Sequence, residues 1–195
     1  MAEGSVHQPR IQALEDEGRR ALVVDGVIIS VEVDEGEAPS GYWGAMLPEG
    51  SPTSALLLGL GGGTLARLLA RRYPGIQMVG VDSDAEVVEF ARERFGLDLP
   101  GLEVVVGDAF EYLDGCRRGF DYVAVDLFAG HAFQRGVLSR PFLRKLKSLA
   151  GRGEVVFNLF QDRRTEQYLK RIGRVLRVQR VDRIGKNVVS HCRGS

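Results

Sequence analysis

A glycine-rich stretch of the chain has the residue types needed to hold a nucleoside. Gly59-Leu60-Gly61-Gly62-Gly63-Thr64 follows an apolar run and precedes a helical pattern. Glycines at such a turn let the backbone approach a ligand closely and point the helix N-terminus at it. A dinucleotide fingerprint would have a third glycine where Thr64 stands, so the loop favours a nucleoside without a pyrophosphate. A glycine-rich turn that binds no ligand has the same pattern, and this alternative stays open.

Two acids follow at spacings that suit the same ligand. Asp82 comes 82 − 59 = 23 residues after Gly59, close to the roughly 20 expected for an acid that accepts hydrogen bonds from ribose hydroxyls. Asp108, within Gly107-Asp108-Ala109, can accept a hydrogen bond from an adenine amino group, and a dinucleotide enzyme does not need this acid. Each acid also has a plainer interpretation as a helix N-cap, although after Asp82 either Ser83 or Asp84 could take that role.

A third acid, Asp126, ends a further apolar run and precedes a loop that contains His131. Ligands of open α/β sheets bind at the carboxyl ends of strands, where Gly59, Asp82, Asp108 and Asp126 are all expected to lie. Asp126 is our candidate for orienting an acceptor, and His131 is a candidate general base, although a lone loop histidine is more often incidental. The three histidines and two cysteines show no ligand spacing, so we expect no metal.

These residues lie on alternating strand and helix patterns, which predict an α/β fold. Strands are expected over 55–60, 76–82, 102–106, 120–126 and 154–159, and helices over 64–73, 84–95, 139–151 and 164–176. Strands over 178–184 and 187–192 flank a Gly185-Lys186 turn and form an antiparallel pair. We therefore expect a doubly wound, mostly parallel seven-stranded sheet with a C-terminal antiparallel hairpin, as in the methyltransferase-type Rossmann variant.

The chain before this pattern looks like a separate part. Residues 1–18 are interpreted as a loose arm or a short helix, and two β-branched runs around Asp25-Gly26 predict a small β-hairpin. Residues 34–53 are expected to form a loop that carries Tyr42 and Trp43. The expected division is an arm, hairpin and loop over 1–53 and a Rossmann-like nucleoside-binding domain over 54–195.

The bulk composition is that of a soluble globular protein. The 195 residues include 26 basic and 26 acidic side chains, so the zero net charge suggests neither a nucleic-acid nor a membrane-surface partner. No apolar run approaches the roughly 20 residues that cross a bilayer, and the N-terminus has no signal-peptide core. We expect a cytoplasmic location.

The motifs resemble a known family. Residues 57–67, 81–88 and 106–110 are similar to the spermidine synthase superfamily of class I S-adenosylmethionine-dependent transferases, and the hairpin at 22–27 resembles that family's N-terminal β-domain. The resemblance runs from about Arg20 to His191. It implies S-adenosylmethionine or decarboxylated S-adenosylmethionine as the cofactor, with Asp82 at the ribose and Asp126 facing the acceptor. The expected cofactor-binding residues are Gly59, Gly61, Gly63, Asp82, Ser83, Asp108 and Ala109.

Four positions depart from the polyamine synthases of that family. Ala129 stands where those enzymes carry a second acid, and Gly61 stands where their glycine loop carries an aspartate. Their glutamine after the Asp-Gly hairpin is replaced near Ile29, and Tyr42-Trp43-Gly44 matches their Tyr-His-Glu run. A diamine acceptor is a dication, and its site needs several acids to offset desolvation. We therefore favour methyl transfer to an unidentified small-molecule acceptor, such as an amine, slightly over aminopropyl transfer.

Two other functions stay open. The chain could bind a nucleoside without turnover, or it could be a dinucleotide oxidoreductase, which Asp108 and the missing third glycine oppose. Relatives of this kind are commonly dimers, so we expect a homodimer.

Overall fold

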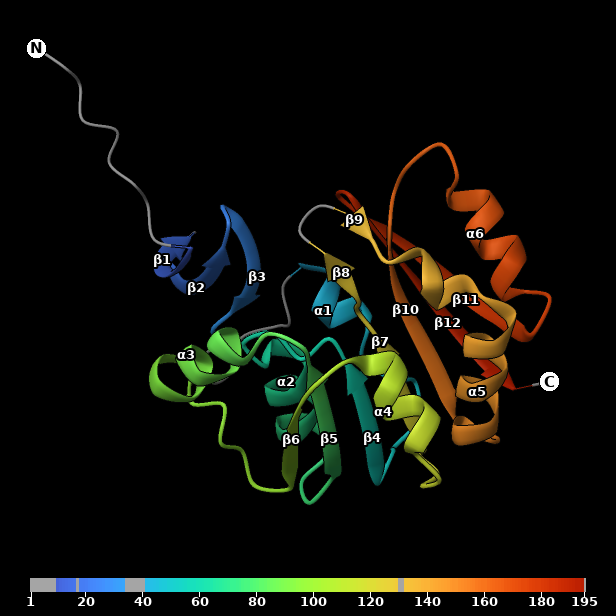
Figure 1. The fold of residues 1–195 in the computed structure, drawn as a ribbon, viewed down its shortest axis with the longest axis horizontal. Helices are drawn as coiled ribbons and strands as arrows, with labels where there is room; N and C mark the ends of the chain where they lie inside the picture. The colour runs from blue at the N-terminus through green and yellow to red at the C-terminus, as the bar shows by residue number, and fades with distance from the viewer. Residues whose placement is uncertain (1–9, 17, 34–40, 130–131, 195) are drawn as a thin grey trace, which may run out of the picture.

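The computed structural model describes residues 10–16, 18–33, 41–129 and 132–194, which form a three-layer α/β structure (Figure 1). The central sheet has the order β11-β12-β10-β7-β4-β5-β6. Its strands are β4 (Ser54–Leu58), β5 (Gln77–Asp82), β6 (Leu102–Val106), β7 (Tyr122–Val125), β10 (Glu154–Phe160), β11 (Leu176–Ile184) and β12 (Asn187–Gly194). Neighbours from β10 to β6 are parallel, and β12 is antiparallel to both β10 and β11. The expected fold class is confirmed.

Helices cover both faces of this sheet because its strands are apolar on both sides. On one face α1 (Gly41–Ala45), α2 (Thr64–Arg72) and α3 (Ala85–Phe95) share a core with Leu57 and Ala124. On the other face α4 (Ala109–Gly115), α5 (Arg140–Ala150) and α6 (Thr165–Ile172) pack on Leu56 and Val125. Neighbouring strand residues thus point to opposite cores. Within the described part of the chain, no helix has the length and apolar character to span a membrane.

The start and end of α5 show how the sequence sets an element's bounds. Ser139 Oγ accepts a hydrogen bond from the Phe142 N–H, Pro141 lies in the first turn, and Gly151 is the C-cap, as predicted. The 3-10 helix η1 (Arg135–Leu138) precedes it, and a two-residue ribbon, β8 (Phe128–Ala129) with β9 (Ala132–Phe133), follows β7. This ribbon stands at the carboxyl end of β7, next to Asp126.

The N-terminal hairpin is confirmed, but it belongs to a three-stranded sheet. β2 (Arg19–Val24) and β3 (Val27–Val31) join at Asp25-Gly26, where both residues have positive φ, 49° and 77°. The expectation of an arm or helix over residues 1–18 is wrong for β1 (Ile11–Asp16), which pairs antiparallel with β2. β1 is mostly exposed, so its strand state comes from backbone pairing with β2, which its sequence pattern does not reveal.

The expectation of a loop over 34–53 is wrong at α1. Trp43 and Met46 are buried in the same core as α2, and that packing holds a helix which glycine-rich composition would not form alone. The Tyr122 hydroxyl donates to the Met46 carbonyl at 2.5 Å, and His191 Nε2 lies 2.7 Å from the Ala45 carbonyl oxygen. These bonds fix the segment that carries Tyr42.

The N-terminal sheet is docked directly on the glycine loop. The Gly62 N–H donates to Ser30 Oγ at 2.7 Å, and Thr64 Oγ1 makes two 2.8 Å hydrogen bonds with the backbone of Val31. A Cβ on Gly62 would lie 2.8 Å from the Ser30 Cβ and 2.9 Å from Leu22 Cδ2. Packing against this sheet is therefore one reason for a glycine at position 62.

Candidate functional site

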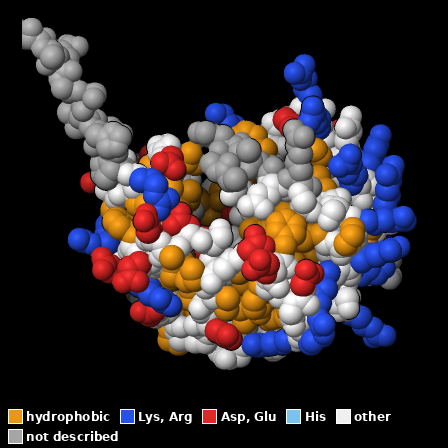
Figure 2. Space-filling view, viewed as in Figure 1, with side chains coloured by type: hydrophobic (Ala, Val, Ile, Leu, Met, Phe, Trp, Pro, Cys, Tyr) orange, Lys and Arg blue, Asp and Glu red, His pale blue; other side chains and the backbone are white. Residues whose placement is uncertain are grey.

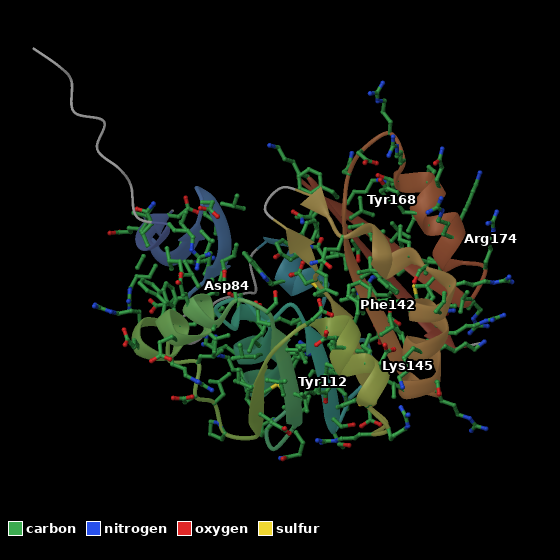
Figure 3. The ribbon with its side chains drawn as sticks, viewed as in Figure 1. Asp84, Tyr112, Phe142, Lys145, Tyr168 and Arg174 are labelled. Atoms are coloured by element: carbon green, nitrogen blue, oxygen red, sulfur yellow. The ribbon has the colours of Figure 1, made fainter. Side chains whose placement is uncertain are left out.

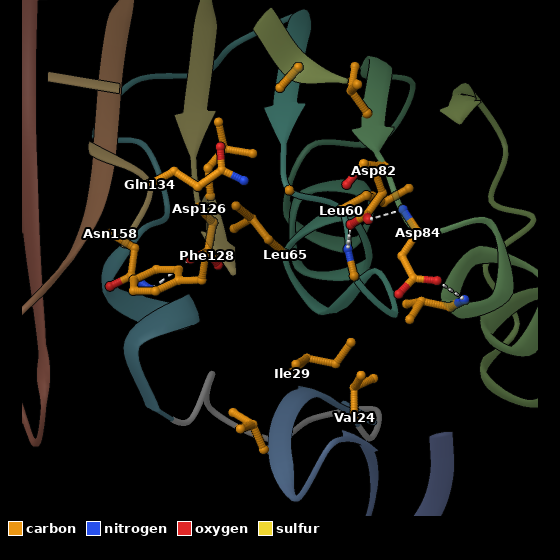
Figure 4. Close-up of a pocket in the computed structure, with 18 of the residues that line it drawn as sticks. Val24, Ile29, Leu60, Leu65, Asp82, Asp84, Asp126, Phe128, Gln134 and Asn158 are labelled. Atoms are coloured by element: carbon orange, nitrogen blue, oxygen red, sulfur yellow. Dashed lines mark hydrogen bonds between the residues drawn. The ribbon is translucent and has the colours of Figure 1, made fainter. Parts of the chain in front are cut away.

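A cavity of about 460 Å³ lies between the carboxyl ends of the central strands and the N-terminal sheet. In Figure 4, Asp82 and Asp84 lie on one side, Asp126 and Asn158 on the other, and Val24 and Ile29 face them across the space. The strand ends that the sequence assigned to ligand binding therefore do converge on one cavity.

The glycine loop forms part of the cavity wall. Gly59 has φ 87°, and a Cβ there would lie 2.1 Å from the Asp126 carbonyl oxygen, so only glycine fits between β4 and β7. Gly61 also has positive φ, and its N–H donates to Asp82 Oδ2 at 2.7 Å. Gly63 does not line the cavity. It is the N-cap of α2, where a Cβ would lie 2.4 Å from Leu97.

Asp82 is held by backbone donors at the end of β5. Besides the bond from Gly61, Asp82 Oδ1 accepts a hydrogen bond from the Asp84 N–H at 3.1 Å. Burial raises the pKa of Asp82, and these backbone bonds counter that effect. The cap of α3 is Asp84, whose Oδ1 accepts from Val87, so Asp82 and the exposed Ser83 are free of that role while both line the cavity.

Asp108 serves its own helix and still borders the cavity. Its Oδ1 accepts hydrogen bonds from the N–H groups of Phe110 (2.7 Å) and Glu111 (3.0 Å) and so caps α4. Its Oδ2 bonds to none of the described residues and can accept from a ligand. Ala109, buried at the start of α4, lines the same wall. The cap and ligand interpretations of Asp108 are thus compatible.

Asp126 is the centre of a hydrogen-bond chain on the opposite side. The Tyr42 hydroxyl donates to its Oδ2 at 3.0 Å, and Asn158 Nδ2 donates to its Oδ1 at 2.8 Å. Asn187 Nδ2 in turn donates to Asn158 Oδ1 at 3.0 Å, which fixes the orientation of that amide. Burial raises the pKa of Asp126 to about 6, although the bonds from Asn158 and Tyr42 lower it.

The same chain keeps Tyr42 in its protonated, donating form. Burial and the neighbouring Asp126 carboxylate raise the pKa of Tyr42 well above its ordinary value. The Tyr42 ring lies 4.3 Å, centroid to centroid, from that of Trp43. Asp126 is therefore a half-buried carboxylate whose two oxygens are held in place by the Tyr42 and Asn158 donors. This arrangement suits a residue that accepts a proton from a substrate.

Sequence reasoning missed this chain of contacts. The sequence places Tyr42 only in an expected loop, does not include Asn158 among the candidate site residues, and gives no role to Asn187. The Gly185-Lys186 turn predicts only that Asn187 begins the last strand opposite Ile184. Its position opposite Phe160, two residues beyond Asn158, comes from the pairing of β12 with β10, which has no local signal in the sequence. The other candidate catalytic residue, His131, lies outside the described residues.

The cavity lining is strongly acidic. Five aspartates line it, namely Asp25, Asp82, Asp84, Asp108 and Asp126. Arg10 is the one basic residue among the described lining residues, and it already pairs with Asp84 at 2.8 Å and with Glu86. The described residues contain no group of three histidine, cysteine or acidic side chains placed to hold a metal ion. The lining as a whole favours a cationic ligand.

Comparisons with known proteins identify relatives of this chain. Residues 55–153 match a family model described as a methyltransferase domain. The chain is 31% identical over 134 residues to a polyamine aminopropyltransferase of Neisseria meningitidis, covering 64% of this chain and 51% of that protein. It is 27% identical over 175 residues to one of Chromobacterium violaceum, covering 84% and 67%. The chain thus spans about half the length of the first of these relatives.

Solved structures show the same fold. A probable spermidine synthase from Corynebacterium glutamicum has a TM-score of 0.78 at 21% identity, covering 94% of this chain and 76% of that chain. A spermidine synthase in complex with the transition-state analogue AdoDATO has a TM-score of 0.71 at 18% identity, covering 95% and 73%. Both likenesses extend over the N-terminal sheet as well as the central one.

Proposed function

Because the chain belongs to the methyltransferase-domain family, we propose that it is a transferase that moves a group from a sulfonium donor to an amine. The donor is S-adenosylmethionine or decarboxylated S-adenosylmethionine, with its ribose at Asp82 and its adenine at Asp108. The acceptor lies beside Asp126. The single observation that carries this proposal is Asp126 itself, a half-buried carboxylate held between Tyr42 and Asn158 across the cavity from the nucleoside side.

The cavity's charge supports decarboxylated S-adenosylmethionine as the donor and therefore aminopropyl transfer. This donor carries a sulfonium and an ammonium group, whereas S-adenosylmethionine carries a carboxylate as well. Five aspartates line the cavity, and Arg10 is already paired, so a donor carboxylate would meet no free cation among the described lining residues. The relatives named polyamine aminopropyltransferases point the same way. Both arguments outweigh our expectation of methyl transfer.

The chemistry needs alignment and one proton acceptor. The acceptor nitrogen's lone pair forms a bond to the carbon next to sulfur, the carbon–sulfur bond breaks, and its electron pair stays on sulfur. The new ammonium loses its proton to Asp126, which is largely deprotonated at neutral pH because its pKa is about 6. The walls from the N-terminal sheet and α1 exclude water and hold the reactants in line.

Methyl transfer is the second candidate, and a specific observation favours it. Ala129 stands where polyamine synthases carry an acid, and Asp126 is the one acid among the described residues on its side of the cavity. A dication such as putrescine would therefore have fewer carboxylates there than it has in those enzymes. A monoamine acceptor carries only one positive charge, so the missing carboxylate does not count against it with either donor.

The test is to incubate the protein with each labelled donor, with and without putrescine or a monoamine. We expect an aminopropylated amine and methylthioadenosine from the decarboxylated donor, and a loss of at least about 100-fold in kcat for Asp126→Asn. A methylated product would select the second candidate. Tight methylthioadenosine binding without any product would instead support a nucleoside-binding protein without turnover. Light scattering in the same buffer tests our further proposal of a homodimer.

A further inference from the structure

The zero net charge of this chain is the sum of a negatively charged part and a positively charged part. Residues 1–130 contain 10 basic and 22 acidic side chains, whereas residues 131–195 contain 16 basic and 4 acidic ones. The second part supplies α5, α6, β10, β11 and β12. Our expectation of no nucleic-acid partner rested on the total charge, which hides this segregation.

The basic side chains gather on one surface of the folded molecule. Figure 2 shows Lys and Arg concentrated on the right-hand side of the view, where Figure 1 places α5, α6 and β11. We call this surface the basic face and define it by six residues of α5, of α6 and of the flanks of α6, namely Arg144, Arg163, Arg164, Lys170, Arg171 and Arg174. All six are exposed, and Figure 3 shows Arg174 directed away from the protein.

Internal acids do not neutralise the basic face. None of its six side chains forms an ion pair with the described residues. The nearby pair of Arg183 with Glu166 uses one of the four acids of residues 131–195. Arg164 is the N-cap of α6, Arg171 lies in its last turn and Arg174 follows its C-cap, so the three cations form a row from one end of this helix to the other. Such a row of like charges repels itself and gains free energy when an anion binds along it.

The chemistry of the face selects one kind of partner. The exposed large hydrophobic residues in the described chain are Leu14, Ile28 and Val106, and all lie at the N-terminal sheet or on β6. The basic face thus lacks the apolar anchors that a protein interface or membrane insertion uses. It cannot meet the same face of a second copy across a twofold axis, because the charges repel. Arginines, five of its six residues, pair well with phosphate oxygens.

We propose that the basic face binds the phosphodiester backbone of nucleic acid without sequence specificity. This binding does not depend on the transferase function, because the six residues lie outside the cavity. Contacts to phosphates alone carry no base information and weaken steeply as salt rises.

Fluorescence anisotropy with a labelled 20-nucleotide RNA and a 20-base-pair DNA tests the proposal on the full chain. We expect binding that weakens steeply between about 50 and 200 mM salt. The triple variant Arg164→Glu, Arg171→Glu and Arg174→Glu should lose affinity by about tenfold or more and flatten the salt dependence. The matched control is Arg72→Glu, Arg94→Glu and Arg117→Glu, which makes the same charge change on exposed residues of the acidic part, residues 1–130, and should lose far less affinity.

Three results would overturn the proposal: no salt-dependent binding to either nucleic acid, equal losses from both triples, or tighter binding to polyglutamate or to phosphatidylserine vesicles at equal anionic charge. Circular dichroism checks that each variant is folded. If the charge-reversal triple does not fold, the same three positions changed to Gln give the comparison, with affinity again expected to fall more than in a Gln version of the control.

Discussion

The hydroxyl of Tyr42 should set the pH at which the site becomes active. Tyr42→Phe removes one of the two side-chain donors to Asp126 and keeps the aromatic ring beside Trp43. The bond from Tyr42 favours the ionised form of Asp126, so its loss must raise the pKa of that carboxyl. If Asp126 acts as the base, it works only when deprotonated, and activity falls as pH drops through its pKa.

The size of the shift follows from the hydrogen bond that is lost. A hydrogen bond to a charged group is worth about 1.5 kcal/mol or more, and about 1.36 kcal/mol corresponds to one pKa unit. The acid limb of kcat/KM should therefore lie near the Asp126 pKa of about 6 in the parent protein. It should lie about one unit higher in Tyr42→Phe. Above both values the two proteins should differ little, because Asp126 is ionised in each.

The assay is product formation from the preferred donor between about pH 5 and pH 9, since kcat/KM reports the ionisation of the free enzyme. Tyr112→Phe is the matched control, because Tyr112 lies on α4 and does not line the cavity. Its acid limb should stay in place. An acid limb that does not move in Tyr42→Phe, or that moves to lower pH, would refute the assignment of Asp126 as the titrating base.

Three further predictions concern stability and are measured by urea unfolding. Asp126→Asn should stabilise the fold at pH 8 by on the order of 2 kcal/mol, because a folded-state pKa raised to about 6 means that ionisation opposes folding. The gain should vanish as pH falls from about 6 to about 4, and an equal gain at pH 4 would contradict the cause. Gly59→Ala should cost roughly 3 kcal/mol or more, because the residue has φ 87° and its new Cβ would lie 2.1 Å from the Asp126 carbonyl oxygen. Gly75→Ala should cost only about 1 kcal/mol, because Gly75 has φ 85° but no atom lies within 4 Å of a Cβ there. Similar losses at both glycines would show that backbone strain, not the contact, dominates. Arg10→Ala should cost no more than about 1 kcal/mol, because its pairing with Asp84 is exposed, and a loss that persists in 1 M salt would argue against an ionic origin.

The parts of the fold that the sequence predicted are those with local signals. Buried parallel strands appear as apolar runs, and Ser139, Pro141 and Gly151 define α5 by capping chemistry alone. Because parallel strands end at one edge of the sheet, the sequence alone predicts that Asp82, Asp108 and Asp126 lie around one site.

What the sequence did not predict depends on contacts between distant segments. β1 owes its strand state to pairing with β2, and α1 owes its helix to the burial of Trp43. The hydrogen bond from Tyr42 to Asp126 joins residues 84 positions apart, and the sequence around each residue does not predict it. The separation of acidic and basic residues is present in the sequence, but the net charge of the whole chain does not reveal it.

The hydrogen bonds between the glycine loop and the Ser30 side chain and Val31 backbone bear on whether the two parts of the chain can fold separately. A cut between residues 53 and 54 would remove the acceptor of the Gly62 N–H and strip Ala21 and Leu22 from the core they share with Leu57. The expected boundary at 53/54 would then mark a change of topology rather than two separable folding units. We expect a single cooperative unfolding transition, and a fragment that begins at residue 54 should expose apolar surface and aggregate.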